Sequence, residues 1–441
     1  MQREKRMNVN HFNTFPYGGA ATAALRLHAE YLKLGHDSRF YFSQQDRQPD
    51  LSAPLTQIQW RAPDASFGGR FLKPFEKRRV RRIHRMYDKH LAQRDPNLEL
   101  FSMAEQVERN RLNSHDFSSG IVHLHWIAFM SDFQTLFRSI PSHTPIVWTL
   151  HDMNPITGGC HYSGGCERFK SGCGSCPQLL QRDTKDLSSH SFGIKAGALR
   201  RKNITIASPS RWLLELAKAS PLFPESTSFH HIRLGFDLKQ LRPEVKVQAR
   251  ERLGIAPDVP LIGFGAEAVG NPRKGLDLLL PALAQLNGRH SLQAAVFGSG
   301  KIGGSGLNLP KIHSLGYVSQ PEKMRDFYSA CDVVVVPSRE DNQPQVGLEA
   351  MACGTPVVAF DVGGVGEYVR PGVTGWLAQA ECSQDLATQI EKLIVDHAGR
   401  QKMSEGARQL IAREFDIATQ AKKYVELYRN LEAANQRQRS A

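Results

Sequence analysis

Asp332-Val-Val-Val-Val-Pro337 begins the stretch of sequence that decides the fold. A polar loop follows this apolar run, then a segment of helical composition from about Val346 to Cys353, and then a second apolar run, Pro356-Val-Val-Ala-Phe360. Short runs that are apolar at every position are typical of strands buried on both faces of a parallel sheet. We therefore interpret the stretch as strand, loop, helix and strand, with the polar loop at the carboxyl end of the first strand.

The same alternation of apolar runs and helical segments extends outward along the chain. Further strand-like runs occupy residues 121–126, 145–150, 203–208, 261–265 and 292–297. The alternation pauses at Leu234-Gly-Phe-Asp237 and resumes after a Gly/Pro-rich linker that ends at Pro260. The pattern predicts an α/β protein with two doubly wound, Rossmann-like domains of α/β/α layers. We expect the first over residues 1–232 and the second from residue 233 on, facing each other across a ligand cleft.

The composition excludes several classes of protein. The chain has 441 residues, of which 41% are hydrophobic, 22% charged and 7 are cysteines, which argues against a disordered, collagenous or disulfide-stapled protein. No apolar run approaches the roughly 18–20 residues that span a bilayer. No apolar stretch of a secretory signal follows Met1-Gln-Arg-Glu-Lys-Arg6, so we expect a cytoplasmic protein. The net charge of +13 suits a nucleic acid, an anionic lipid or a phosphorylated ligand.

Two carboxylates belong to the stretch that decides the fold, Asp341 in the loop and Glu349 early in the helix. The free N–H groups and positive dipole of a helix N-terminus suit a phosphate, and Glu349 can accept hydrogen bonds from vicinal hydroxyls. The alternative is an ordinary strand–loop–helix with solvated acids. Spacing alone gives the two interpretations equal weight.

This stretch resembles the signature of family 4 glycosyltransferases, which are retaining enzymes of the GT-B fold that use sugar nucleotides. Glu349-Ala-Met-Ala-Cys-Gly-Thr-Pro-Val-Val358 fits the family pattern position for position, and Asp341 stands where the family has an earlier Glu. The resemblance implies that Glu349 holds the ribose hydroxyls and that Asp341 lies near the donor sugar and the leaving diphosphate. It also implies that the second domain covers residues 233–415, and that residues 416–441 form a helix crossing back to the first domain and a polar tail.

A basic pair follows the predicted strand at residues 261–265. Lys274 is a point charge suited to a diphosphate and Arg273 adds a planar fork, although a Lys near a helix start is more often only solvated. In the family a Lys at this place neutralises the donor diphosphate. The family Arg that commonly precedes it is missing, and Arg273 and Arg339 are the candidates to replace it.

Three turns supply further candidate nucleotide contacts. They contain Gly18 and Gly19, Tyr317 and Val318, and Gly363 and Gly364. The family places the first turn beneath the donor diphosphate and the second around the nucleotide base. The glycines of the third let backbone N–H groups approach an anion. The alternative for each is a plain tight turn.

His151 directly follows the apolar run at residues 145–150. A lone His is more often structural than chemical, but the family has a His at this point that reaches the transferring sugar. The resemblance therefore implies a catalytic set of His151, Asp341 and Lys274. We expect His123 and His125, which alternate with apolar residues, to pack or to fix loops.

Four of the seven cysteines have the spacing C-x5-C-x6-C-x2-C; they are Cys160, Cys166, Cys173 and Cys176. Four thiolates in a cytosolic chain suggest a structural, tetrahedral Zn²⁺ site with no open position, so no catalytic metal is expected. Two disulfides, four free thiols and a ligand role for His161 are the alternatives. The insertion, about residues 157–178, and the preceding Leu150-His-Asp-Met-Asn-Pro-Ile-Thr-Gly-Gly resemble family 4 enzymes of exopolysaccharide and O-antigen (colanic-acid-type) assembly.

Arg70–Arg85 contains eight Lys/Arg against one acid. Apolar residues recur near helical spacing, so the segment after Pro74 predicts a basic amphipathic helix that suits an anionic membrane. A solvated basic face and an RNA-binding patch are the alternatives. No nucleic-acid-binding module is recognisable, so we expect no nucleic-acid partner.

These features and the resemblance together imply a retaining hexosyltransferase. Its donor would be a UDP- or GDP-linked nucleotide sugar, and its acceptor a hydroxyl of a glycan or lipid-linked glycan in surface polysaccharide assembly. We expect it in the cytoplasm, with peripheral contact to the inner membrane face as a further interpretation. A nucleotide-sugar hydrolase or epimerase of the same fold, and a non-catalytic basic adaptor for membranes or polyanions, are the alternatives.

Overall fold

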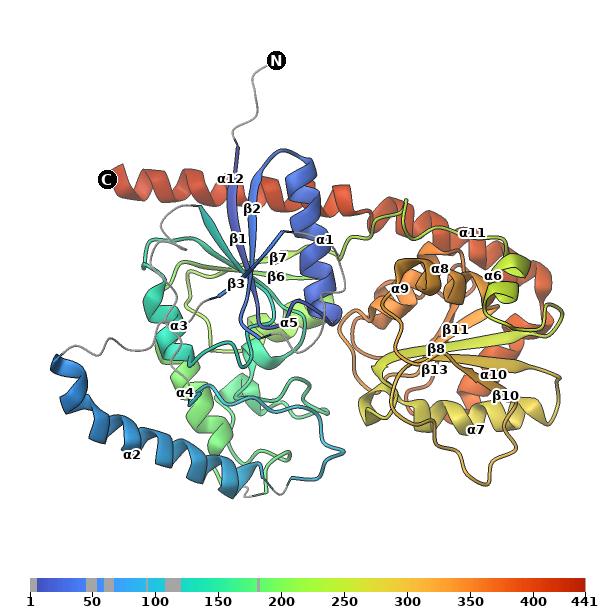
Figure 1. Ribbon diagram of the computed structural model, residues 1–441, viewed down its shortest axis with the longest axis horizontal. Coiled ribbons are helices and arrows are strands. Elements are labelled where there is room, and N and C mark those ends of the chain that lie inside the picture. The colour runs from blue at the N-terminus through green and yellow to red at the C-terminus, as the bar shows by residue number, and fades with distance from the viewer. Residues whose placement is uncertain are drawn as a thin grey trace, which may run out of the picture. The chain divides into compact units, whose positions relative to one another are not determined.

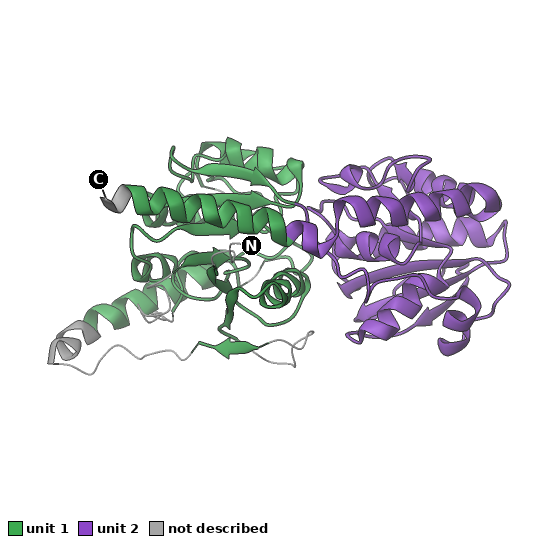
Figure 2. Cartoon of the chain, turned by 90° about the horizontal axis from the view of Figure 1, so that it is seen from above, with its two compact units in different colours: residues 1–232, 421–441 green, residues 233–420 purple. Residues whose placement is uncertain are grey.

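The computed structural model describes residues 6–44, 54–58, 67–92, 94–107, 120–180 and 183–440, and for 67–73 and 438–440 it describes the backbone alone. The chain divides into two compact units, unit 1 with residues 1–232 and 421–441 and unit 2 with residues 233–420 (Figure 2). Each unit has its own sheet and its own core.

The sheet of unit 1 is parallel, with the strand order β3-β2-β1-β4-β5-β6-β7. Its strands are β1 (Asn8–Asn13), β2 (Asp37–Phe42), β3 (Leu55–Gln57), β4 (Ile121–Leu124), β5 (Ile146–Thr149), β6 (Ile204–Ser208) and β7 (Ser228–His231). From β1 the chain adds strands in one direction, and from β4 in the other. The pair β1 and β4 is therefore the switch point, where open α/β sheets bind ligands.

Helices cover both faces of this sheet (Figure 1). They are α1 (Gly19–Lys33), α3 (Phe133–Ser139), α4 (Leu187–Leu199), α5 (Arg211–Ala219) and, from Ala421 on, α12 (Ile417–Ser440), while α2 (Phe67–His90) and the short helices η2 (Asn154–Ile156) and η3 (Arg168–Ser171) belong to connections. Consecutive residues of β5 take part in different cores, because alternate side chains of a strand point to opposite faces. Trp148 packs with α3 and α4 residues, whereas Val147 packs with Tyr424 and Tyr428 of α12.

The sheet of unit 2 is also parallel, with the order β10-β9-β8-β11-β12-β13. Its strands are β8 (Leu261–Ala268), β9 (Gln293–Ser299), β10 (Lys311–Ser314), β11 (Val333–Val336), β12 (Val357–Phe360) and β13 (Gly375–Ala378). Its helices are α6 (Lys246–Arg252), η4 (Pro272–Lys274), α7 (Leu276–Asn287), α8 (Pro321–Ala330), α9 (Gln345–Ala352), η5 (Val365–Glu367), α10 (Ser383–Val395) and α11 (His397–Glu414). The switch point lies between β8 and β11.

The stretch that decides the fold becomes β11, a loop, α9 and β12. All four residues of β11 and all four of β12 are buried, and Val335 pairs with Val358. The predicted class of two parallel-sheet α/β domains is confirmed. Among the helices of the described residues, none combines the length and the apolar character needed to cross a membrane.

Candidate functional site

Three loops meet at the carboxyl edge of the unit 2 sheet, because the three strands that they follow are neighbours. The loop after β8 contains η4 with Arg273 and Lys274, the loop after β11 contains Asp341, and the loop after β12 contains Gly363 and Gly364. The first two loops flank the switch point between β8 and β11. Five of the residues predicted as nucleotide contacts therefore share one edge.

Asp341 is the centre of this cluster and is 4% exposed. Its Oδ2 accepts hydrogen bonds from Lys274 Nζ at 2.6 Å, from Arg273 Nη1 at 3.1 Å and from Ser338 Oγ at 3.2 Å. Its Oδ1 accepts from the backbone N–H of Asn342 at 3.1 Å. One carboxylate thus holds two cations in place.

The basic pair also controls the ionisation of Asp341. Burial by itself raises the pKa of this carboxyl, but the charges of Lys274 and Arg273 outweigh burial and hold the pKa at about 2. Asp341 is therefore ionised at neutral pH. Lys274 and Arg273 remain partly accessible, with 25% and 15% of their side chains exposed.

Glycines let the three loops approach each other closely. Gly363 has a φ of +56°, and a Cβ added there would lie 2.0 Å from the carbonyl oxygen of Asp341. The N–H of Gly364 donates to that same carbonyl oxygen at 3.1 Å. Gly275 has a φ of +72°, and its Cβ would lie 1.9 Å from the carbonyl oxygen of Pro337. Side chains at Gly363 or Gly275 would push these loops apart.

Arg339 is directed away from the cluster, so Arg273 is the better candidate for the missing family Arg. The Arg339 guanidinium forms a fork on Asp277, with Nη1–Oδ1 at 2.9 Å and Nη2–Oδ2 at 2.7 Å, and its Nε donates to Glu381 Oε2 at 3.1 Å. Arg273 instead donates to Asp341 and to the carbonyl oxygen of Glu340.

Glu349 lies on α9 and is 8% exposed. Its Oε2 accepts a hydrogen bond from the Tyr328 hydroxyl of α8 at 2.8 Å, which fixes the carboxylate. Tyr368, which follows the glycine turn in the chain, packs closely on α9. A Cβ added at Gly347 of α9 would lie 2.6 Å from the Tyr368 hydroxyl. The carboxylate predicted to bind ribose is therefore held on a rigid element.

The predicted base turn lies at the same edge of the sheet, beside the end of β9. Gly316 has a φ of +64°, and its carbonyl oxygen accepts from the N–H of Gly298 at 2.8 Å. The following Tyr317 is 41% exposed, and Val318 is half-buried. In unit 1, Gly18 caps α1 with a φ of +86°, and the exposed Gly19 begins the helix after β1.

A chain of histidines runs along the carboxyl edge of the unit 1 sheet. His151 Nε2 lies 3.2 Å from His125 Nδ1, and His125 Nε2 lies 3.0 Å from His11 Nδ1. Burial lowers the pKa of all three rings, to about 4 for His151, so the chain is neutral at pH 7. The predicted His151 therefore acts as a hydrogen-bonding group and not as a cation.

Among the described residues, His11, His123 and His125 are the group whose potential ligand atoms lie within 4.8 Å of one another. His123 uses both ring nitrogens for protein partners, with Nε2 at 2.7 Å from Thr149 Oγ1 and Nδ1 at 2.6 Å from the Tyr428 hydroxyl. His125 also has both nitrogens engaged. We therefore interpret the group as a hydrogen-bond network.

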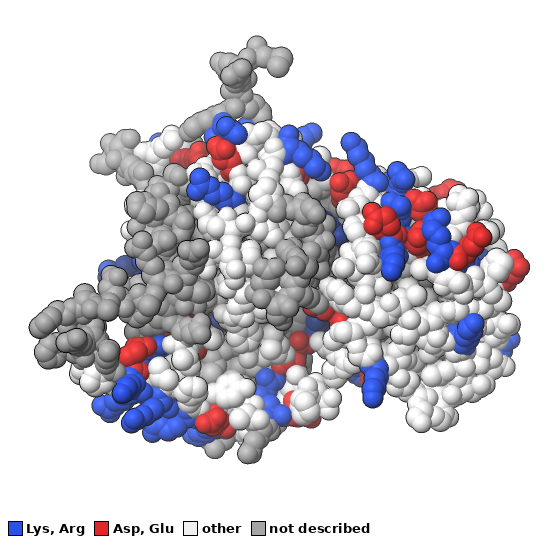
Figure 3. Space-filling model, viewed as in Figure 1, with Lys and Arg blue, Asp and Glu red and all other residues white. Residues whose placement is uncertain are grey.

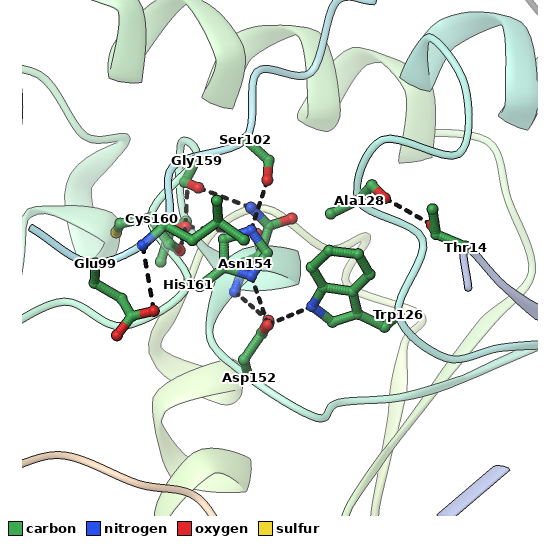
Figure 4. A network of polar contacts seen from close by, with 12 residues as sticks. Thr14, Glu99, Ser102, Trp126, Ala128, Asp152, Asn154, Gly159, Cys160 and His161 are labelled. Carbon is green, nitrogen blue, oxygen red and sulfur yellow. Dashed lines mark hydrogen bonds and ion pairs between the residues drawn. The ribbon is translucent and has the colours of Figure 1, made fainter. Parts of the chain in front are cut away.

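Next to His151, Asp152 joins the connection after β5 to the loop after β4 (Figure 4). Its Oδ2 accepts from Trp126 Nε1 at 2.7 Å and from His161 Nδ1 at 2.6 Å, and its Oδ1 accepts from the N–H of Asn154 at 2.9 Å. His161 Nε2 in turn lies 2.6 Å from Ser102 Oγ. His161, weighed as a zinc ligand, has both nitrogens committed here.

The four clustered cysteines line one small cavity in unit 1, and all are free thiols. No three of their sulfurs come within 4.8 Å of one another in this part of the described structure, so the ligand spacing does not support the predicted zinc site. The disulfide alternative is not present either. Burial raises the pKa of Cys173 to about 11 and that of Cys160 further.

Helix α2 carries the predicted basic segment, but it begins at Phe67 and continues through Pro74 instead of starting after it. Figure 3 shows Lys and Arg side chains gathered along it. The exposed ones among its described side chains are Lys77, Arg78, Arg81, Arg82, Arg85 and Lys89. The side chains of Arg70 and Lys73 lie outside the described residues. Ile83 is buried, whereas Phe75 is 71% exposed.

The sequence predicts that His125 packs or fixes loops, whereas the structure places it in the histidine chain between His151 and His11. The signal was available: His123 and His125 are two positions apart and so share one face of the sheet, and His11 is in register with His123 on the neighbouring strand. Asp152 has no predicted role of its own. Nothing in its spacing points to Trp126 or His161.

Comparison with known proteins places residues 259–396 in the sequence family described as "Glycosyl transferases group 1". The chain is 37% identical over 174 residues to a D-inositol 3-phosphate glycosyltransferase of Rhodococcus erythropolis, covering 36% of this chain and 39% of the relative. The chain is 36% identical over 192 residues to the D-inositol 3-phosphate glycosyltransferase of Geodermatophilus obscurus. This match covers 40% of this chain and 41% of the relative. The matches thus span about two fifths of these curated relatives.

Solved structures resemble the whole chain at low identity. Sucrose-phosphate synthase (tll1590) from Thermosynechococcus elongatus has a TM-score of 0.65 at 18% identity and covers 97% of this chain and 100% of its own. Anabaena Alr3699/HepE in complex with UDP and glucose also has a TM-score of 0.65 at 18% identity, covering 96% and 100%. At such identities the likeness shows the fold alone, two parallel-sheet α/β domains of the GT-B kind.

Proposed function

Residues 259–396 are a group 1 glycosyl transferase domain, and from this premise we propose that the whole chain is a retaining glycosyltransferase. It moves a hexose from a nucleotide diphosphate sugar to a hydroxyl of a glycan or lipid-linked glycan in surface polysaccharide assembly. Unit 2 binds the donor, and unit 1 receives the acceptor. The matches to the D-inositol 3-phosphate glycosyltransferases cover too little of the chain to carry over the compound in their name.

The observation that carries this proposal is the pair of cations beside one carboxylate at the switch point of unit 2. Lys274 and Arg273 are both fixed by Asp341 and both partly accessible, so they present a preorganised positive site for a diphosphate. The glycine turn at Gly363 and Gly364 borders the same loop, and the N–H of Gly364 fixes the backbone of Asp341.

The chemistry follows from where charge develops. The bond between the anomeric carbon and the diphosphate oxygen breaks, and the acceptor oxygen bonds to that carbon on the same face. The acceptor proton passes to an oxygen of the leaving diphosphate. Lys274 and Arg273 stabilise the negative charge on that diphosphate, which is the largest expected contribution. Asp341 and the neutral His151 orient the sugar, the second through its hydrogen-bonded histidine chain.

The donor that we propose is a UDP-sugar, with a GDP-sugar as the second candidate. The carboxylate of Glu349, held by Tyr328, suits the two hydroxyls of a ribose. Tyr317 and Val318 border the base at the same sheet edge. The Anabaena neighbour, which shares the fold, is known in complex with UDP-glucose.

We also propose that unit 1 meets an anionic membrane from the cytoplasmic side through α2. Lysine and arginine side chains near an anionic surface contribute about 1 kcal/mol each. The exposed Phe75 adds an apolar contact beside the basic face. Such a contact suits a lipid-linked acceptor.

A thermal-shift screen of UDP-, GDP-, ADP- and CMP-sugars tests the function. A ligand at about one hundred times its Kd stabilises a protein by about 2.7 kcal/mol, so one nucleotide class should raise the Tm by several degrees. Incubation of that sugar with and without a polysaccharide acceptor then identifies the reaction. Release of free sugar or an epimer without acceptor would point to a hydrolase or epimerase, and the absence of any shift would point to an adaptor.

Replacing Glu349 with glutamine should raise the Kd of the nucleoside diphosphate about 10- to 100-fold. A hydrogen bond to a charged group contributes about 1.5–3 kcal/mol, and the amide offers a weaker acceptor to the ribose. Isothermal titration calorimetry measures the effect. Glu322→Gln, an exposed acid in the first turn of α8, is the matched control and should bind as the wild type does. Equal affinity in both variants would contradict the ribose assignment.

A further inference from the structure

Four aromatic side chains that have no part in the proposed transfer gather at the carboxyl edge of the unit 1 sheet. Phe15 and Tyr17 lie on the loop after β1, and Trp126 and Phe129 lie on the loop after β4. These two strands are the neighbours at the switch point, where open α/β sheets bind ligands. We propose that the four side chains form a subsite for a sugar ring of the acceptor, which lies against the face of Trp126. The assignment to the acceptor rests on the proposed transferase function, whereas the binding of a sugar ring does not.

The four rings contact one another without being buried. The ring centre of Trp126 lies 5.8 Å from that of Phe15 and 6.0 Å from that of Phe129. The ring centres of Phe15 and Tyr17 lie 5.2 Å apart. All four residues are half-buried, whereas Phe12, on the strand before the first loop, is fully buried. Aromatic surface that stays within reach of solvent at a switch point is typical of a ligand site.

The chemistry of the two loops suits an uncharged sugar ring. The face of an aromatic ring carries negative partial charge, and the C–H groups on one face of a pyranose carry positive partial charge. Sugar hydroxyls need hydrogen-bonding partners at the rim, and Tyr17 brings a hydroxyl group to the cluster. Residues 14–18 and 125–132 contain no lysine or arginine, so a neutral ligand is favoured over a phosphate.

The indole of Trp126 is fixed by a carboxylate. Its Nε1 donates to Asp152 Oδ2 at 2.7 Å (Figure 4). Burial raises the pKa of Asp152, but His161 and the N–H donors of this carboxylate outweigh burial and hold the pKa below its ordinary value. The hydrogen bond to the indole is therefore charge-assisted. The ring cannot turn without losing that bond, so its face is preorganised for a ligand.

The backbones of the two loops are also tied to each other. The N–H of Trp126 donates to Asn13 Oδ1 at 2.8 Å, and the carbonyl oxygen of Trp126 accepts from the N–H of Thr14 at 2.8 Å. The Thr14 hydroxyl donates to the carbonyl oxygen of Ala128 at 2.6 Å (Figure 4). The rings on the two loops therefore keep their spacing before any ligand binds.

Phe129 has a backbone conformation that local stability alone would not select. Its φ is +62°, in the left-handed region. The N–H of Met130 donates to the carbonyl oxygen of Ile127 at 3.1 Å, so Phe129 is the third residue of a tight turn. Glycine or asparagine is usual at such a position, and a bulky side chain there is an outlier. Strain of this kind concentrates at ligand sites, which indicates that the ring of Phe129 has a task beyond the turn.

The cluster is also next to the group that we expect to reach the transferring sugar. His125 directly precedes Trp126, and its Nδ1 lies 3.2 Å from His151 Nε2. Asp152, which holds the indole, directly follows His151. A sugar ring against Trp126 is thus placed beside the expected reacting centre, as attack by one of its hydroxyls requires.

Saturation-transfer NMR of the full chain tests this subsite without any transfer reaction. The probes are the methyl glycosides of glucose, galactose, mannose and N-acetylglucosamine. At least one of them should receive saturation from the protein, most strongly at the C–H protons of one ring face. Trp126→Ala should reduce that saturation by about fivefold or more, and Trp126→Phe, which keeps an aromatic face, should recover part of it. Tyr87→Ala, which removes a 50% exposed ring of α2, is the matched control and should bind as the wild type does.

A second variant keeps the test decisive if Trp126→Ala does not fold. Phe129→Gly removes a ring and suits the left-handed backbone, so it should melt at a higher temperature than Phe129→Ala and still lose saturation. Saturation that is absent from the wild type, or unchanged in these variants, would overturn the subsite. So would displacement of the sugar by UDP, which would assign the rings to the nucleotide. Sugar binding that is intact in a protein with no response to nucleotide sugars would instead contradict the transferase function alone.

Discussion

Replacing Lys274 with alanine should lower kcat by about 100- to 1000-fold, the usual effect of removing one preorganised charge from a developing anion. Lys274 Nζ lies 2.6 Å from Asp341 Oδ2 and is partly accessible, so it can move from the carboxylate to a diphosphate with little change of position. Arg273 remains in the variant and should keep some donor binding. The KM of the donor should therefore change less than kcat.

Steady-state rates with the sugar nucleotide found in the screen measure this effect. Lys311→Ala is the matched control. Lys311 is exposed and begins β10, so it lies at the end of the sheet where the strands start, away from the carboxyl edge with Lys274. It should transfer at the wild-type rate. Equal rates for Lys274→Ala and the control would remove Lys274 from the mechanism, and with it the main support for the donor site.

Replacing Asp341 with asparagine should destabilise the protein by about 3 kcal/mol or more. Removing one partner of a buried ion pair costs about 3–5 kcal/mol, because the remaining charge loses its compensation. Here Lys274 and Arg273 would both lose it. Since both cations are partly exposed, we expect the lower end of that range. Denaturant unfolding monitored by circular dichroism measures the loss.

Asp277→Asn is the matched control, because it breaks the ion pair between Asp277 and Arg339. The side chain of Asp277 is 59% exposed. Exposed pairs contribute about 0–1 kcal/mol, so the control should be close to wild type. Asp341→Glu, which restores the residue of the family pattern, should recover part of the stability. A loss in Asp341→Asn no larger than in the control would show that the buried pair is not stabilising.

Ionisation of the Asp341 carboxyl makes the stability that this residue contributes depend on pH, and the direction of the dependence follows from its pKa. The pKa of Asp341 is held at about 2, below its ordinary value, so its contribution to stability is complete above about pH 4. The contribution falls as the pH drops from about 4 to about 2, where the folded protein takes up the proton. The difference in stability between wild type and Asp341→Asn should shrink over that range.

The sequence predicts the interior of each sheet well and its borders poorly. Strands β4, β5, β6, β8, β9, β11 and β12 coincide with apolar runs because both of their faces are buried. The edge strands β3, β7, β10 and β13 were missed, as was β2. An edge strand is covered on fewer sides, and Lys311-Ile-His-Ser314 and Ser228-Phe-His-His231 have no fully buried residue. Their polarity resembles that of loops.

In the candidate site, chain order determines which loops meet, and packing determines which side chains face each other. The loops with Lys274, Asp341 and Gly363 meet at one edge because the strands before them are parallel neighbours, an arrangement that the alternation predicts. Whether Arg273 or Arg339 faces Asp341 depends on side-chain partners far along the chain, such as Asp277 and Glu381. No spacing in the sequence contains that information.

The last helix imposes an order on how the protein assembles during synthesis. Tyr424 and Tyr428 of α12 are buried in unit 1. The Tyr424 hydroxyl forms a hydrogen bond with Thr149 on β5, and the Tyr428 hydroxyl forms one with His123 on β4. The ribosome makes these tyrosines only after all of unit 2. The first sheet therefore leaves the ribosome with part of one apolar face uncovered, although α1 already packs on that face, and waits in that state while unit 2 is made. The unit that begins to fold first is thus the last to be completed, and chaperones have that interval in which to bind it.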